Sequence, residues 1–173
     1  MRCFIAIDIP KEVKDEIAKI QKLLPEFEGK LTEKENLHLT LKFLGEVSPE
    51  EIEKVKERLG KIKLKRFSAS LGGLGIFSES FVRIVWIKLG NCDELQGKVD
   101  YFLKDLFKKE ERFMGHLTIA RVKQIGDKKK FLDLLGKVKY PKTEFEVDKI
   151  SLKNSVLTKK GPIYEDIFSV SLD

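Results

Sequence analysis

The chain contains only two histidines, His38 and His116, and each begins the same kind of tetrapeptide, HLTL and HLTI. An imidazole titrates near pH 6.5, so one member of a histidine pair can accept a proton while the other donates one. The hydroxyls of Thr40 and Thr118 are compact hydrogen-bond donors for phosphate oxygens. This set has the equipment for in-line attack at phosphorus, with protonation of the opposite oxygen and without a metal.

Two other interpretations of the histidines compete with this one. Each histidine could be a satisfied residue on a sheet face, but both histidines of the chain lie in the motif, at equivalent positions of a repeat. A zinc site usually has three or four ligands, and no carboxylate or cysteine stands at ligand spacing here. Acid–base chemistry is the interpretation that these residue types favour.

A β-strand would place the polar side chains of each motif on one face. His38 and Thr40 then share a face, and Leu39 and Leu41 point to the other, because side chains alternate along a strand. If the two halves pack about a pseudo-twofold axis, both His-Thr pairs face one cavity. Lys42 falls on the same face as His38, so it could reach an RNA phosphate or could be a solvated lysine at the strand end.

The elements around the motifs repeat in order when the chain is shifted by 78 positions, the separation of the two histidines. Segments rich in β-branched and aromatic residues, 3–9 and 81–89, precede the amphipathic helical patterns. The motif strands follow. The sequence thus predicts β-α-β-α-β twice, with the glycine-rich segment 72–80 connecting the halves and with segments 65–71 and 143–149 as equivalent last strands.

Helix starts are marked by capping residues. Ser48 and Glu51 have the spacing of a capping box, and Asp127 is placed to cap the corresponding helix of the second half. Asn91 is the expected N-cap of the helix that follows segment 81–89.

Composition limits the class of protein. The net charge is +6 and the pI about 9.1, which favours polyanionic partners, although lysines and glutamates are interleaved as on a solvated surface. Charged residues make up 36%, which is typical of a thermophile surface. No apolar run suits a membrane span or signal peptide, so we expect a cytoplasmic protein. Cys3 and Cys92 form no disulfide framework or zinc pattern and are expected to be buried.

The paired motifs make this chain resemble the two-histidine phosphoesterase superfamily, and most closely its RNA 2′,3′-cyclic phosphodiesterase branch, also called 2′-5′ RNA ligase. MRCFIAIDIP, NLHLTLKFLGEV, GHLTIARV and GPIYEDIFSVSL resemble the blocks of that branch, so the likeness covers nearly the whole chain. It implies a bilobal α+β fold in which two mainly antiparallel sheets line a central cleft. The expected organisation is one domain over 1–173, with repeats at about 1–71 and 81–157 and a C-terminal strand at 163–172.

The resemblance also implies an activity. The expected reaction is hydrolysis of an RNA terminal 2′,3′-cyclic phosphate to a 2′-phosphate, without a metal or other cofactor. A weak, ATP-independent 2′-5′ ligation of RNA, with a ribose hydroxyl in place of water, is expected beside it. The implied partner is RNA with a cyclic phosphate end, spliced tRNA halves being one such RNA, and the protein is expected to be a monomer.

Roles carry over to individual residues. His38 and His116 would be the catalytic acid–base pair, and Thr40 and Thr118 would bind the non-bridging phosphate oxygens. The resemblance implies that His116 is the base and His38 the acid, but no residue in this sequence decides between this assignment and its reverse. Arg121 matches an arginine that follows the second motif and could hold phosphate or stack on a base. Strand alternation puts Arg121 opposite His116, so this role requires a bulge or strand end, and a surface arginine is the alternative.

Two aromatic residues are further candidates for substrate binding. Phe4 and Tyr164 could stack a terminal base. Core packing is the alternative for Phe4, and capping of the last strand for Tyr164. Trp86 is expected in the core, and glycines 72, 73 and 75 form no phosphate-binding fingerprint. Two alternatives to RNA-end hydrolysis stay open: hydrolysis of a small cyclic nucleotide such as ADP-ribose cyclic phosphate, and a non-catalytic RNA-binding module.

Overall fold

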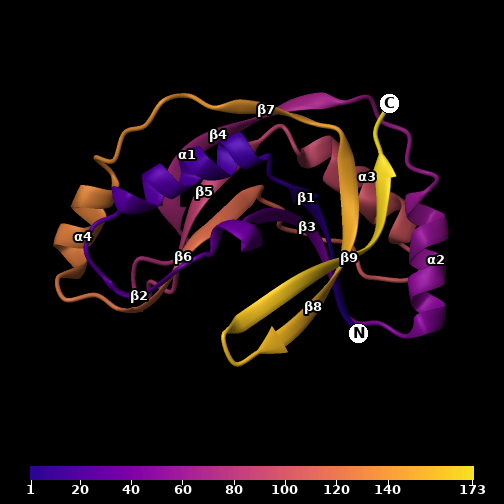
Figure 1. Cartoon of the computed structure of the whole chain (residues 1–173), viewed down its shortest axis with the longest axis horizontal. Coiled ribbons are helices and arrows are strands. Elements are labelled where there is room, and N and C mark those ends of the chain that lie inside the picture. Colours follow the sequence, from indigo (N-terminus) through magenta and orange to yellow (C-terminus); the bar gives the residue numbers. More distant parts are fainter.

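The computed structural model describes residues 1–173 and has two antiparallel sheets with helices packed outside them (Figure 1). This confirms the predicted α+β class. The helices are α1 (Lys11–Lys22), α2 (Pro49–Leu59), α3 (Asp93–Leu103), α4 (Lys128–Leu135) and the 3-10 helix η1 (Lys34–Asn36). The strands are β1 (Arg2–Asp8), β2 (Glu28–Leu31), β3 (His38–Glu46), β4 (Phe67–Ile76), β5 (Ile84–Gly90), β6 (His116–Gln124), β7 (Glu144–Val147), β8 (Lys149–Thr158) and β9 (Gly161–Ser171).

Each sheet takes strands from both halves of the chain. The first has the order β3-β1-β8-β9, and the second has the order β2-β6-β5-β4-β7. The motif strands β3 and β6 pair with β1 and β5 respectively, as the repeat predicts. The C-terminal strands β8 and β9 complete the sheet that the N-terminal strands begin.

The alignment of segment 65–71 with segment 143–149 does not describe strand equivalence. Ala69 pairs with Phe145, and Phe67 pairs with Val147, so β4 and β7 are neighbours in one sheet. The structure confirms that both segments contain strands. Periodicity identifies a strand but not its partner, and β4 instead forms a hairpin with the next strand, β5.

The glycine-rich segment is only partly a connection. Residues 72–76 belong to β4, and residues 77–83 join β4 to β5. Gly75 lies against the indole of Trp86, where a Cβ atom would come within 2.3 Å of a ring carbon. A side chain there would displace the indole, so the glycine permits the close approach of β4 to Trp86.

Helix packing joins the two halves further. Helix α1 contacts β6 of the second sheet and α3 contacts β3 of the first, and Figure 1 shows α1 with α4 at one end and α2 with α3 at the other. A single cluster of 36 buried apolar residues, including Cys3 and Cys92, forms the core. None of the helices has the length and apolarity needed to cross a membrane.

Two of the three predicted caps are present. Ser48 and Glu51 form the capping box at α2, and Asp127 accepts a hydrogen bond from the backbone N–H of Lys130 at α4. The prediction for Asn91 is wrong, because Cys92 is the N-cap of α3. Asn91 has φ of 69° and donates its side-chain amide to the Ser68 carbonyl instead. Asparagine tolerates this left-handed conformation well, so the residue makes the turn that precedes the cap.

Candidate active site

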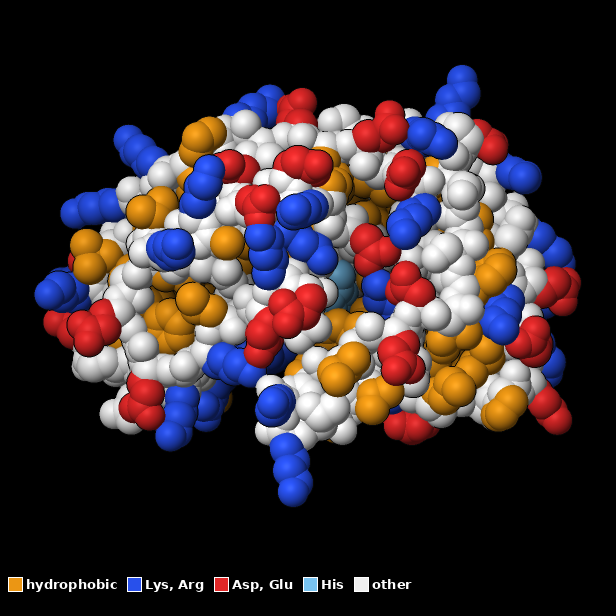
Figure 2. All heavy atoms as spheres, in the orientation of Figure 1, with side chains coloured by type: hydrophobic (Ala, Val, Ile, Leu, Met, Phe, Trp, Pro, Cys, Tyr) orange, Lys and Arg blue, Asp and Glu red, His pale blue; other side chains and the backbone are white.

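A cleft of about 550 Å³ contains both motifs. Its walls come from β1, β3 and β6, from the segment β2–η1, and from the β8–β9 hairpin. In Figure 2, histidine atoms are visible in a hollow near the centre of the face, between charged side chains. Seven of the eight residues singled out from the sequence line the cleft: Phe4, His38, Thr40, His116, Thr118, Arg121 and Tyr164.

A β-bulge interrupts each motif strand just after its threonine. Thr40 pairs with Ala6, but the next pair along the strand is Lys42 with Ile5, so one extra residue lies between them. Strand β6 has the same irregularity, because Thr118 pairs with Trp86 while Ala120 pairs with Val85. An extra residue reverses the alternation of all the residues that follow it.

The first bulge removes Lys42 from the cleft, and the prediction for this residue is wrong. Its side chain is 4% exposed and forms a buried ion pair with Asp100 of α3. Phe43 takes the cleft-facing position in its place. Lys42 therefore links β3 to α3 and has no access to an RNA phosphate.

The second bulge brings Arg121 into the cleft. Simple alternation would have turned this side chain away from His116, and the structure supplies the bulge that the predicted role requires. Arg121 occupies the position in β6 that Phe43 occupies in β3, five residues after the histidine in both cases.

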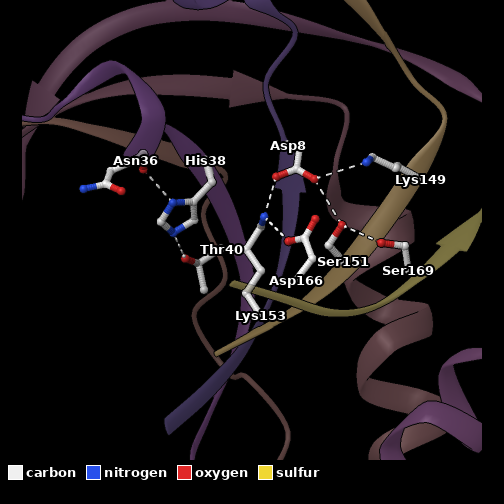
Figure 3. A network of polar contacts seen from close by, with 9 residues as sticks. All are labelled: Asp8, Asn36, His38, Thr40, Lys149, Ser151, Lys153, Asp166 and Ser169. Atoms are coloured by element: carbon white, nitrogen blue, oxygen red, sulfur yellow. Dashed lines mark hydrogen bonds and ion pairs between the residues drawn. The ribbon is translucent and has the colours of Figure 1, made fainter. Parts of the chain in front are cut away.

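The two histidine rings are anchored in the same way. Nδ1 of His38 lies 2.7 Å from the Asn36 carbonyl oxygen, and Nδ1 of His116 lies 2.7 Å from the Met114 carbonyl oxygen. A carbonyl only accepts, so each Nδ1 carries the hydrogen and each Nε2 is the atom left for chemistry. Nε2 of His38 lies 3.1 Å from Oγ1 of Thr40, whose hydroxyl can donate to the neutral ring (Figure 3).

Burial lowers the pKa of His38 to about 4, and the nearby ammonium of Lys153 acts in the same direction. The hydrogen bond to the Asn36 carbonyl opposes the shift without reversing it. The imidazole is therefore neutral at pH 7.

A polar network lies beside His38 on the same sheet (Figure 3). Asp8 is the strand partner of His38, and its carboxylate lies 2.7 Å from the ammonium of Lys153, which also contacts Asp166. Ser151 donates a hydrogen bond to Asp8. Burial alone would raise the pKa of Asp8, but the hydrogen bonds from Lys153 and Ser151 lower it overall. The network thus keeps Asp8 ionised and bound to Lys153.

An aromatic wall stands on the His38 side of the cleft. The ring centres of Phe4 and Tyr164 lie 4.9 Å from that of His38 and 5.1 Å from each other. Phe4 is only 3% exposed, so it is packed like a core residue while still lining the cleft. Burial raises the pKa of Tyr164.

The LigT-like phosphoesterase model, described as "LigT like Phosphoesterase", matches residues 7–86 and 90–164. The chain belongs to this family. A Methanocaldococcus jannaschii protein named RNA 2′,3′-cyclic phosphodiesterase is 45% identical over 96% of this chain and 98% of its own length. An Archaeoglobus fulgidus protein with the same name is 37% identical over the same shares. The crystal structure of Escherichia coli LigT complexed with 3′-AMP has a TM-score of 0.79 at 25% identity, covering 99% of this chain and 97% of that one.

These findings confirm the family that the two motifs indicated. Sequence reasoning nevertheless missed several residues that line the cleft of this LigT-like chain. Phe43 could have been found, because it has the same offset from His38 that drew attention to Arg121. The other missed residues include Arg2, Lys30, Asn36, Leu157 and Pro162, none of which belongs to a His-Thr motif.

Trp86 lies beside His116 and outside the core cluster, contrary to expectation. Its ring centre is 6.5 Å from that of His116, and its Nε1 is buried without a hydrogen-bond partner. The strand pairing explains the position, because Trp86 is opposite Thr118 and therefore shares the face of the motif.

Charged groups in the cleft favour an anion. Three basic residues, Arg2, Lys30 and Arg121, line it together with one acidic residue, Glu33, which is paired with Lys30. Nowhere in the chain do three His, Cys, Asp or Glu side chains gather as a metal site would require.

Proposed function

We propose that this protein hydrolyses the terminal 2′,3′-cyclic phosphate of RNA to a 2′-phosphate, using two histidines as acid and base and no metal. The observation that carries the proposal is the presence of both His-Thr pairs in one cleft, with each Nδ1 held by a backbone carbonyl and each Nε2 left for chemistry. The names of the M. jannaschii and A. fulgidus relatives support the RNA cyclic phosphate as substrate.

The phosphate would bind between the two motif strands. The hydroxyls of Thr40 and Thr118 would donate to the non-bridging oxygens, and the guanidinium of Arg121 would balance the negative charge. All three side chains line the cleft beside the histidines. These donors are positioned before the reaction, so they can stabilise the charge that builds up on the phosphorane oxygens.

The aromatic wall orients the substrate. Phe43 and Tyr164 lie on the His38 side, where their rings can stack the terminal base, and the buried ring of Phe4 packs against both. The ribose then lies nearer His38, and its O3′ is the leaving oxygen. His116 accepts the proton of the attacking water, the new P–O bond forms opposite O3′, and the P–O3′ bond breaks as His38 protonates O3′.

Because the pKa of His38 is low, His38 can act as the acid only when substrate is bound. The ring is neutral at pH 7, because burial holds its pKa near 4. A phosphodiester anion against Nε2 favours the protonated ring, since an opposite charge at contact distance raises a histidine pKa. His38 is thus neutral in the free enzyme, and binding of the phosphate favours the protonated ring that can act as the acid.

The same geometry accommodates a weak 2′-5′ RNA ligase activity. A 5′-hydroxyl of another RNA would replace water as the group deprotonated by His116. The P–O3′ bond breaks as before, and the 2′-oxygen keeps the phosphate, so the product has a 2′-5′ linkage.

The test is incubation of a short RNA ending in a 2′,3′-cyclic phosphate with the intact protein in excess EDTA, beside a folded His116→Ala variant. We expect a 2′-phosphate from the intact protein and almost none from the variant. A 3′-phosphate product would contradict the O3′ leaving group, and loss of activity in EDTA would contradict the metal-free mechanism. If RNA gives no product, small cyclic nucleotides are the next substrates, and RNA binding without turnover would favour a binding module.

A further inference from the structure

An exposed aromatic surface lies on the β4–β5 connection, residues 77–83, next to His116. Phe77 is 56% exposed and Phe81 is 61% exposed. The guanidinium of Arg83 stands 4.2 Å from the centre of the Phe81 ring. We call these three residues the Phe77–Phe81 surface. None of the three lines the 550 Å³ cleft, so the surface lies beyond the site already described.

Phe77 connects this surface to the reaction centre. The ring of Phe77 lies 5.1 Å from that of His116 at an angle of 89°, and 5.9 Å from that of Trp86. The edge-on contact with His116 leaves more than half of the Phe77 side chain open to solvent. An aromatic face next to a catalytic imidazole is a position where a base could stack.

In-line displacement determines which strand could reach this surface. The attacking oxygen must approach phosphorus from the side opposite O3′. With the terminal nucleoside against the aromatic wall on the His38 side, the attacking oxygen enters on the His116 side. A water molecule needs no further space there, but a 5′-hydroxyl brings a ribose and a base that must extend past His116.

We propose that the Phe77–Phe81 surface is the acceptor subsite, which stacks the first bases of an RNA strand that presents its 5′-hydroxyl to the cyclic phosphate. The inference rests on the proposed function, because it needs the same two histidines. The 5′-hydroxyl proton passes to His116, the 5′-oxygen–phosphorus bond forms, and the P–O3′ bond breaks with the proton from His38 going to O3′.

The chemistry of the surface suits single-stranded RNA. Phenyl faces stack any base with little sequence preference, and the cation of Arg83 attracts the phosphates that follow the first nucleoside. The β4–β5 connection therefore contributes binding to the acceptor but none to a water nucleophile. Loss of the Phe77 or Phe81 side chain should therefore lower the rate of ligation more than the rate of hydrolysis.

The matched variants are Phe77→Ala, Phe81→Ala and the control Tyr101→Ala. Tyr101 lies on α3, is 62% exposed, and has the ammonium of Lys104 4.6 Å from its ring centre. It thus copies the exposed aromatic–cation pair at a place away from the cleft. Phe77 and Phe81 are both largely exposed, so at least one variant is expected to fold normally.

The first measurement is binding of a short 5′-hydroxyl RNA, with the cleft filled by an RNA ending in a 2′-phosphate. Trp86 is the only tryptophan and lies against Phe77, so its fluorescence reports stacking there. We expect saturable quenching by the intact protein, and about 10-fold weaker binding by Phe81→Ala, as loss of a base–aromatic stack predicts. The Tyr101→Ala variant should bind like the intact protein.

The second measurement is the ratio of ligated to hydrolysed product from a cyclic phosphate RNA and a 5′-hydroxyl RNA. We expect a ratio about 10-fold lower in Phe77→Ala and Phe81→Ala than in Tyr101→Ala. Equal ratios in all variants, or unchanged binding by Phe81→Ala, would overturn the acceptor subsite. If the intact protein hydrolyses no cyclic phosphate, the proposed function fails, and the Trp86 titration, repeated without the 2′-phosphate RNA, still decides whether RNA binds this surface.

Discussion

The two histidines stand on equivalent strands with the same motif, bulge and Nδ1 anchor, but their surroundings differ. Asp8 is the strand partner of His38, whereas Lys88 is the strand partner of His116. Asp8 belongs to a partly buried network with Lys153, while Lys88 is exposed. Thus the duplicated strands hold two imidazoles in the same way, and the residues around them make the two sides of the cleft unlike.

The aromatic neighbours differ in the same way. The rings beside His38, Phe4 and Tyr164, form an inner wall of the cleft. The rings beside His116 are the half-buried Trp86 and the largely exposed Phe77. An enclosed wall suits the terminal nucleoside, and an open one suits water or a second strand. Under the proposed mechanism, this asymmetry corresponds to His38 as the acid and His116 as the base.

The largest effect is expected from removing either imidazole. His38→Ala and His116→Ala should each lower the hydrolysis rate by about 10²–10⁴-fold, as loss of a general acid or base does. Circular dichroism would check the fold, and single-turnover kinetics on a cyclic phosphate RNA would measure the rate. A near-normal rate in either variant would remove that histidine from the chemistry.

The roles of the two histidines can be separated with a 3′-sulfur leaving group. A thiolate leaves without a proton, because its conjugate acid is far stronger than that of an alkoxide, so the acid becomes dispensable. We expect a 3′-thio cyclic substrate to restore about 10²-fold or more of the rate lost in His38→Ala, within the range attributed to a general acid. The same substrate should restore little in His116→Ala. The reverse pattern would exchange the two roles.

Stability should depend on pH through His38. Its folded pKa is near 4 and its unfolded pKa near 6.5, so the unfolded chain binds a proton first as pH falls. The protein therefore loses stability between pH 6.5 and 4, by roughly 3 kcal/mol at most. Urea unfolding of the intact protein and His38→Gln across this window would measure the loss, which the variant should lack. Parallel curves would show that the ring is not held neutral. Asp8 makes a separate contribution to stability, because its pKa is lowered in the folded protein. That contribution is lost only when the pH falls below the ordinary aspartate range.

The smallest effects are expected at the two positions that follow the bulges. Arg121→Ala should lower kcat/KM by about 10–100-fold, because it removes charge-assisted hydrogen bonds to phosphate. Phe43→Ala should lower it by about 10-fold or less, through lost stacking. Steady-state kinetics at two salt concentrations would distinguish the two variants. Only the contribution of Arg121 to kcat/KM should decrease as salt increases, because it is electrostatic. An equal salt response would contradict the different roles.

The family and several local elements could be predicted from the sequence alone. The two HxT motifs identified the family, and Ser48 with Glu51 and Asp127 marked two helix starts, because capping depends on residues within one turn. Strand alternation placed His38 and Thr40 on one face, since both precede the bulge.

Features that depend on neighbouring strands could not be predicted from the sequence. The bulges send Lys42 to Asp100 and turn Arg121 into the cleft, and a bulge is defined by pairing with a partner strand. Likewise, the partner of β4 and the low pKa of His38 arise from segments far apart in the chain. Local periodicity carries no record of these contacts, because the same alternating pattern satisfies any neighbouring strand.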